Sequence, residues 1–231
     1  MAAVTEYFWL ATAKSEGLLA SDTVPNPFQV TMCPATTGMQ QHRSLRRLHD
    51  LALQVRHSKR DEWLIFSWRG ELAVHQKLLA EFEERRFTGY RLRPCTVRFR
   101  TGRVSHEYSE LMVTGWAGMA RPESGIRLIG TCKGCDYRIY SPLEDAEKLI
   151  DWSQWTGEDF FMVWPLPGYP LITRRVADAF EEMRVRSYTL RSLQFLQMRG
   201  RLYSRFELGP LSQFMPQDLA TRYGKPLGID P

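Results

Sequence analysis

The chain contains little of what marks a membrane protein or a secreted, disulfide-bonded one. Its 231 residues include only four cysteines, irregularly spaced, so we do not expect a disulfide framework. The longest apolar runs, such as Phe160 to Trp164, fall far short of the ~20 residues that cross a bilayer. The first residues place no basic segment before an apolar stretch, so we expect no signal peptide. The sequence therefore predicts a cytoplasmic protein with no membrane partner.

The sequence motifs of common enzyme classes are also missing. The chain has no Gly-x-Ser-x-Gly, no phosphate-binding glycine loop and no His-Glu-x-x-His. Two pairs of adjacent carboxylates occur, Glu83-Glu84 and Glu181-Glu182. Neighbouring residues on a helix point about 100° apart, which suits a solvated helix face better than paired acid–base catalysis. The sequence therefore predicts a protein that is not an enzyme.

The composition is that of a folded, basic protein. Hydrophobic residues make up 43% of the chain and charged residues 25%, which argues against disorder. The net charge is +5, an excess that can serve nucleic acid or an acidic protein partner. The arginines are scattered, and the only tight run is Arg43 to Arg47. We therefore favour a solvated basic face over a nucleic-acid surface.

A short pattern of aromatic and acidic residues occurs twice. The first copy covers about 62–93 and the second about 159–191. Phe82 and Phe180 lie 98 positions apart, and the tyrosines that close the two copies have the same offset. A repeat at such spacing indicates a duplicated supersecondary unit.

Periodicity predicts the elements of each copy. In the first, a strand of aromatic and β-branched residues at 63–68 precedes helical spacing over 71–86 and a further strand. The second repeats this order with a strand at 160–164 and a helix at 174–184. Thr173 stands where the N-cap of that helix belongs. Each copy therefore reads as a strand–helix–strand module.

Three further elements are expected outside the copies. Residues 4–12 are typical of an opening strand. Over 42–55, apolar residues recur at spacings of three and four, which predicts an amphipathic helix. A short helix is expected at 144–152.

Together these elements predict an α+β fold. Two related strand–helix–strand modules are joined by an antiparallel meander, which carries a Cys-x-x-Cys hairpin at about 126–140. We expect a single domain over 1–193, followed by an irregular, proline-containing extension at 194–231.

The Cys-x-x-Cys pair is the main candidate for chemistry. Two residues between Cys132 and Cys135 let both thiolates face one metal ion, as in a zinc knuckle. A structural zinc needs four ligands, and the remaining candidates are Cys33, Cys95, His42 and His106. Three interpretations stay open: a structural zinc site, a degenerate site that folds without metal, and a redox dithiol.

Several stretches together resemble a known family. Residues 159–169, followed by Ile172-Thr173-Arg174-Arg175-Val176 and a helix, are similar to the C-terminal module of bacterial polymorphic-toxin immunity proteins. The order of motifs over 28–193 resembles the double-CxxC group of that family. Cys33-Pro34 falls at the first knuckle, where Thr36 stands in place of the second cysteine.

The second knuckle falls at Cys132 to Cys135, and Asp136 follows it where the family has glycine. The resemblance implies a non-enzymatic immunity protein that binds and neutralises a cognate bacterial toxin. It also implies a metal site shared by the knuckles, with Cys33, Cys132 and Cys135 as ligands. The positive charge favours an acidic toxin surface or a non-nuclease toxin. The alternative is a zinc-ribbon-like module that binds nucleic acid.

Overall fold

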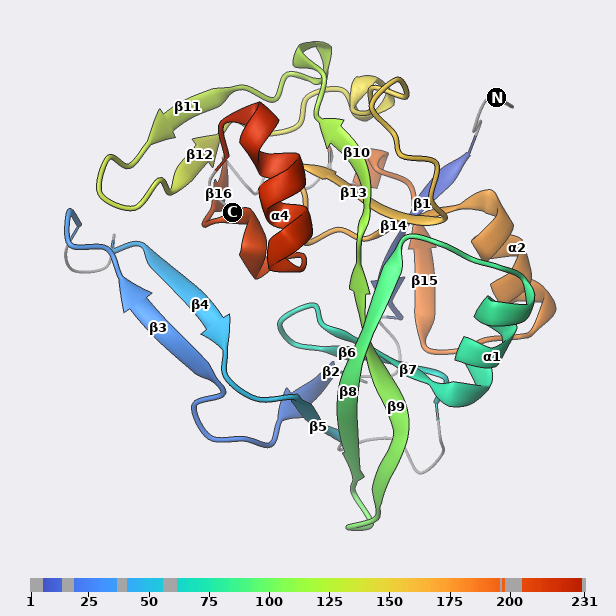
Figure 1. The fold of residues 1–231 in the computed structure, drawn as a ribbon. Coiled ribbons are helices and arrows are strands. Elements are labelled where there is room, and N and C mark those ends of the chain that lie inside the picture. Colours follow the sequence, from blue (N-terminus) through green and yellow to red (C-terminus); the bar gives the residue numbers. More distant parts are fainter. Residues whose placement is uncertain are drawn as a thin grey trace.

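Strands dominate the computed structural model of the chain, which describes residues 6–13, 19–36, 41–55, 62–195, 197 and 205–229. About 40% of the residues lie in strands and 20% are helical. The predicted α+β class is therefore wrong. The helices are short, and two multi-stranded sheets, one of them closed, form the body of the molecule (Figure 1).

Six strands close into a barrel in the order β2-β5-β8-β9-β7-β6. Their bounds are β2 Leu19–Asp22, β5 Leu51–Val55, β6 Leu64–Ser67, β7 Leu72–His75, β8 Tyr90–Phe99 and β9 Val104–Val113. Parallel pairing of β6 with β2 completes the closure. Side chains such as Ile65, Val97 and Tyr108 are buried together in this barrel, which is therefore filled like other small barrels.

A second sheet stands beside the barrel in the order β10-β13-β14-β1-β15. Its strands are β1 Tyr7–Thr12, β10 Gly115–Met119, β13 Phe160–Trp164, β14 Leu171–Thr173 and β15 Tyr188–Arg191. All five residues of β13 are buried, as expected for a central strand that is covered on both faces.

The two copies of the repeat have matching structures. Each forms a hairpin, a helix and a strand: β6-β7-α1-β8 in the first copy and β13-β14-α2-β15 in the second. Helix α1 spans Gln76–Glu84 and α2 spans Arg174–Glu182, with His75 and Thr173 at equivalent N-caps. The predicted strand–helix–strand module is incomplete because β7, expected as the first turn of a helix, pairs with β6 and β9.

Equivalent residues of the two copies meet in one core. Phe82 on α1 stacks against Phe180 on α2, with ring centroids 5.9 Å apart and planes inclined by 11°. Both rings are fully buried, in a cluster to which each copy contributes. Outside this core, Arg85 donates to the carboxylate of Glu182 at 2.9 Å. The duplicated units therefore pack directly on each other.

The helix predicted over 42–55 is wrong. The segment forms β4 (Arg43–Arg47) and β5 instead. Leu51, Leu53 and Val55 are buried while the residues between them are half-buried, the alternation of a strand. Partners distant in the sequence decided the outcome, because β5 pairs with β2 and β8. The helix predicted at 144–152 is only a short 3₁₀ turn, η4 (Ala146–Lys148).

Two smaller sheets complete the fold. Strand β3 (Phe28–Met32) pairs with β4, and β11 (Leu128–Thr131), β12 (Arg138–Tyr140) and β16 (Phe206–Leu208) form a three-stranded sheet. In Figure 1 the β3-β4 hairpin lies at the side of the barrel, and its far end approaches the loop between β11 and β12.

The segment predicted as an irregular extension is partly ordered. It contains β16, helix α4 (Gln217–Gly224) and the 3₁₀ turns η5 (Leu211–Gln213) and η6 (Lys225–Leu227); a further turn, η3, spans Pro122–Ser124. Leu211, Met215 and Ala220 are buried in the same cluster as Trp164. None of the helices in the described ranges has the length and apolar character needed to cross a membrane.

Candidate metal centre

The β3-β4 hairpin brings the first two site residues together. Cys33 follows β3 directly and His42 precedes β4, so the register of the hairpin places them opposite each other. The backbone N–H of Cys33 donates to the carbonyl oxygen of His42 at 2.9 Å. The Nε2 amide of Gln41 also donates to the Cys33 carbonyl at 3.3 Å. Backbone hydrogen bonding therefore fixes the relative positions of Cys33 and His42.

The β11-β12 hairpin supplies the other two residues. The N–H of Cys132 donates to the carbonyl of Tyr137 at 2.8 Å, and the N–H of Asp136 donates back to the carbonyl of Cys132 at 2.9 Å. This tight turn holds Asp136 at a φ of 51°, in the left-handed region. Aspartate tolerates that region better than most residues, so it can occupy this turn position.

The four side chains converge on one point. The ligand atoms of Cys33, His42, Cys132 and Cys135 all lie within 4.8 Å of one another. The Sγ atoms of Cys33 and Cys132 are 3.6 Å apart, and Cys135 Sγ lies 3.7 Å from His42 Nδ1. Ligands about 2.0–2.3 Å from a tetrahedral zinc ion lie roughly 3.6–3.8 Å from each other. The Cys33–Cys132 and Cys135–His42 separations therefore match such an ion.

The thiols have different acidities. Burial opposes the ionisation of Cys33, but a hydrogen bond from the Ala35 amide and the neighbouring Cys135, Thr36 and Cys132 side chains outweigh it, lowering its pKa to about 7. Burial, together with the neighbouring Cys33 and Cys132 thiols, raises the pKa of Cys135 to about 12. The Cys33 thiolate therefore forms readily near neutral pH, whereas ionisation of Cys135 needs a bound cation.

The surroundings of the four residues restrict their positions. The His42 ring stacks on Tyr137, with centroids 4.2 Å apart and planes inclined by 13°. The Ala35 N–H donates to the Cys33 sulfur at 3.4 Å. A Cβ atom at Gly134 would lie 2.5 Å from that of Ala35, so the two knuckles touch and a glycine is needed between Cys132 and Cys135.

The other predicted candidates lie elsewhere. Cys95 is buried in the barrel on β8, and burial raises the pKa of its thiol to about 12. His106 is exposed on β9, with Nδ1 at 3.5 Å from the Thr96 hydroxyl. Of the candidates named from the sequence, the structure thus brings together Cys33, Cys132 and Cys135 with His42.

Other side chains at the site had only weak signals in the sequence. Gly134 and Tyr137 flank Cys135 at the knuckle, where small and aromatic residues are unremarkable taken singly. Compared with protein-family models and with curated proteins, the chain matches none. The donor set itself therefore carries the functional argument: three sulfurs and one imidazole nitrogen, which zinc prefers.

Proposed function

We propose that the chain is a non-enzymatic binding protein fastened by one structural zinc ion. The observation that carries this proposal is the convergence of four ligand atoms from two hairpins within 4.8 Å. A closed set of four protein ligands leaves no position for water or substrate, which distinguishes structural from catalytic zinc sites. His42 would take the place of the cysteine that the first knuckle lacks.

A metal assay tests this proposal. The purified full chain is expected to carry about one zinc ion per molecule by elemental analysis. Cys132→Ser and His42→Ala should each remove most of the metal, because either change leaves three ligands. Cys95→Ala is the matched control, a buried cysteine outside the cluster, and should retain it. A metal-free native chain, or equal loss in the Cys95 variant, would refute the assignment.

We propose further that the binding partner is a cognate bacterial toxin that the protein neutralises. Support comes from the order of knuckles and modules over 28–193, and from the proximity of Cys33 to Cys132 and Cys135, which a metal site shared by the two knuckles needs. The test is expression of the chain together with the product of the adjacent open reading frame. Restored growth is expected; toxicity unchanged by the chain would rule out this role.

A zinc-ribbon-like module that binds nucleic acid is the second candidate. The basic β4 strand, with Arg43 and Arg46 exposed at the side of the molecule, favours it. Binding of short DNA or RNA that weakens steeply with added salt would support this role. Absence of binding at low salt would eliminate it.

A further inference from the structure

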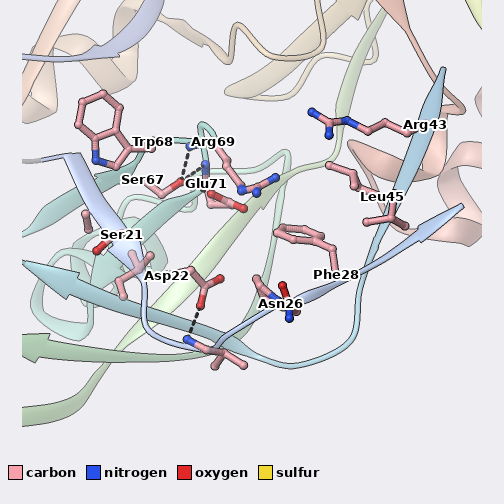
Figure 2. A pocket seen from close by; sticks show the side chains of 15 residues that line it. Ser21, Asp22, Asn26, Phe28, Arg43, Leu45, Ser67, Trp68, Arg69 and Glu71 are labelled. Atoms are coloured by element: carbon pink, nitrogen blue, oxygen red, sulfur yellow. Dashed lines mark hydrogen bonds between the residues drawn. The ribbon is translucent and has the colours of Figure 1, made fainter. Parts of the chain in front are cut away.

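A hollow lies between the β3-β4 hairpin and the barrel. Its volume is about 460 Å³, within the range of small binding sites. Strands β2, β3 and β4 and the turn between β6 and β7 line it. Figure 2 shows Phe28 and Leu45 projecting from the hairpin toward it, with Ser67 and Glu71 on the side of the barrel.

The face of the hairpin on this side is partly apolar and exposed at its outer end. Alternation along β3 puts Phe28, Val30 and Met32 on the same face as Leu45 of β4. Val30 is 49% exposed and Met32 46%. The opposite face carries polar residues such as Gln29. A sheet normally buries its apolar face, yet the part of this face at Val30 and Met32 stays open.

The outer edge of β3 is also free. In the described part of the chain β3 pairs with β4 alone. The N–H of Cys33 donates to His42 and the N–H of Leu48 donates to Pro27. Odd-numbered residues of β3 therefore direct their backbone groups toward β4, and even-numbered residues direct theirs away. By that alternation the backbone groups of Val30 point outward, away from β4. An exposed edge with apolar side chains and no charge within the strand is a template for another strand.

Across the hollow, the turn after β6 presents two residues of the kinds that dominate protein interfaces. Trp68 is 73% exposed, although its place in the first repeat favoured a buried strand. The guanidinium of Arg69 lies 4.5 Å from the centroid of the Phe28 ring, and that of Arg47 lies at the same distance. Trp68 is therefore the exposed aromatic side chain of the lining, while two guanidiniums cover the Phe28 ring.

The charge at the rim is positive. Asp22 and Glu71, the carboxylates in the lining, both bind Arg47, at 2.7 Å and 2.5 Å. Arg43 and Arg69 form no ion pair with any described carboxylate. A ligand of this surface must therefore satisfy two cations as well as cover apolar side chains.

We propose that the hollow and the free edge of β3 form the docking site for an extended acidic segment of a protein partner. The segment adds to β3 as a strand, and its apolar side chains cover Val30 and contact Trp68. Its carboxylates meet Arg43 and Arg69. The inference rests on the proposed function in one respect: the segment then belongs to the neutralised toxin.

The test uses the zinc-loaded full chain and a short fluorescein-labelled peptide in which glutamate and valine alternate. Binding is measured by fluorescence anisotropy, and a lysine–valine peptide should not bind. Trp68→Ala and Arg69→Glu should each weaken binding roughly thirtyfold, the effect expected at an interface hot spot. Ile129→Ala, exposed to 60% on β11, and Arg98→Glu, exposed on β8, are the matched controls and should bind normally.

A backbone variant tests the strand pairing itself. Val30→Pro removes an N–H that points away from β4 and should abolish binding while zinc content and thermal stability are retained. Thr31→Pro removes an N–H that faces β4 and should disrupt the hairpin as well. Failure of the acidic peptide to bind, or equal binding to Val30→Pro and the native chain, overturns the proposal. Binding of oligothymidylate at Trp68 in place of the peptide overturns it in favour of nucleic acid.

Protection from the toxin separates this proposal from the proposed function. If the native chain protects and both Trp68→Ala and Val30→Pro do not, the docking site is supported. If those variants protect as well as the native chain, the site is wrong and the function stands. If the native chain does not protect, the toxin assignment fails, and the peptide measurements alone decide the site.

Discussion

The duplicated modules and the β3-β4 hairpin are held in place by different interactions. The modules share a buried aromatic core in which Phe82 and Phe180 are both fully inaccessible. The hairpin has no comparable core, since four of its five β3 residues are exposed. It is fixed at one end by the Cys/His cluster and at the other by Arg47, which binds Asp22 and Glu71.

The modules therefore account for most of the stability, whereas the hairpin offers the surface proposed for binding. Apolar burial supplies most of the free energy of folding and is spread over many residues. The Cys/His cluster and the Arg47 ion pairs hold the β3-β4 hairpin in position without adding apolar burial. The hairpin can therefore keep an apolar face uncovered, which the modules cannot, and the two regions should respond differently to substitution.

The largest effect is expected in the core between the modules. Phe180→Ala removes a ring stacked on Phe82 and should lower the free energy of unfolding by ~3–5 kcal/mol. Urea unfolding followed by tryptophan fluorescence measures it. Trp68→Ala, the exposed counterpart, should stay within ~0.5 kcal/mol of the native chain. Similar losses in the two variants would contradict the proposed division.

Loss of the ion pairs should have the next largest effect. Arg47→Met leaves Asp22 and Glu71, whose side chains are only 15% and 16% exposed, without their cation. Removing one partner of such a buried network costs about 3 kcal/mol. Arg46→Met, on the same strand but exposed, serves as the control in the same denaturation experiment. Equal effects of the two substitutions would show that the pairing contributes nothing.

Removal of zinc should loosen the hairpin more than it unfolds the protein. With free zinc a hundredfold above the dissociation constant, the ion contributes ~2.7 kcal/mol. Limited proteolysis after chelation should cut within β3 and β4 while α1 and α2 stay intact, since four of the five β3 residues are exposed. Re-addition of zinc should restore resistance. First cuts in the modules would show that the ion supports the whole fold.

The smallest change in stability is expected from substitutions at equivalent positions in the two copies of the repeat. Arg86 and Arg184 follow α1 and α2 with the same left-handed φ of 53°. Glycine adopts this conformation without strain, so Arg86→Gly and Arg184→Gly should each stabilise the chain by about 1 kcal/mol. Glu84→Gly, inside α1, should destabilise it instead. Opposite signs at the two equivalent positions would show that the copies have diverged in their local energetics.

The candidate site was largely predictable because its signal is local. The two residues between Cys132 and Cys135 fix the geometry of one knuckle wherever the chain places it. Cys33 and His42 belonged to a longer set of candidates, and only the β3-β4 register selects them. Cys95 was indistinguishable from them in sequence, although a central barrel strand buries it.

The barrel could not be predicted in the same way. Its closure depends on pairings such as β2 with β6 and β5 with β8, which join segments far apart in the sequence. Leu45, Leu48 and Leu51 have helical spacing, yet the pairing of β5 with β8 outweighs that local preference. The equivalent helices α1 and α2 were predictable because the same periodicity occurs in both copies. Nothing in the sequence showed that Trp68 lies beyond its strand, in an exposed turn.

The separation of Cys33 from Cys132, 99 residues along the chain, has a consequence for synthesis on the ribosome. At about 5–20 residues per second, roughly 5–20 seconds pass between the emergence of the first knuckle and that of the second. Throughout this interval the nascent β3-β4 segment has neither its distal anchor nor a complete set of metal ligands. Its bare strand edge is then open to any neighbouring chain. Completion of the cluster is therefore timed by translation, and zinc can be captured fully only after Cys135 has emerged.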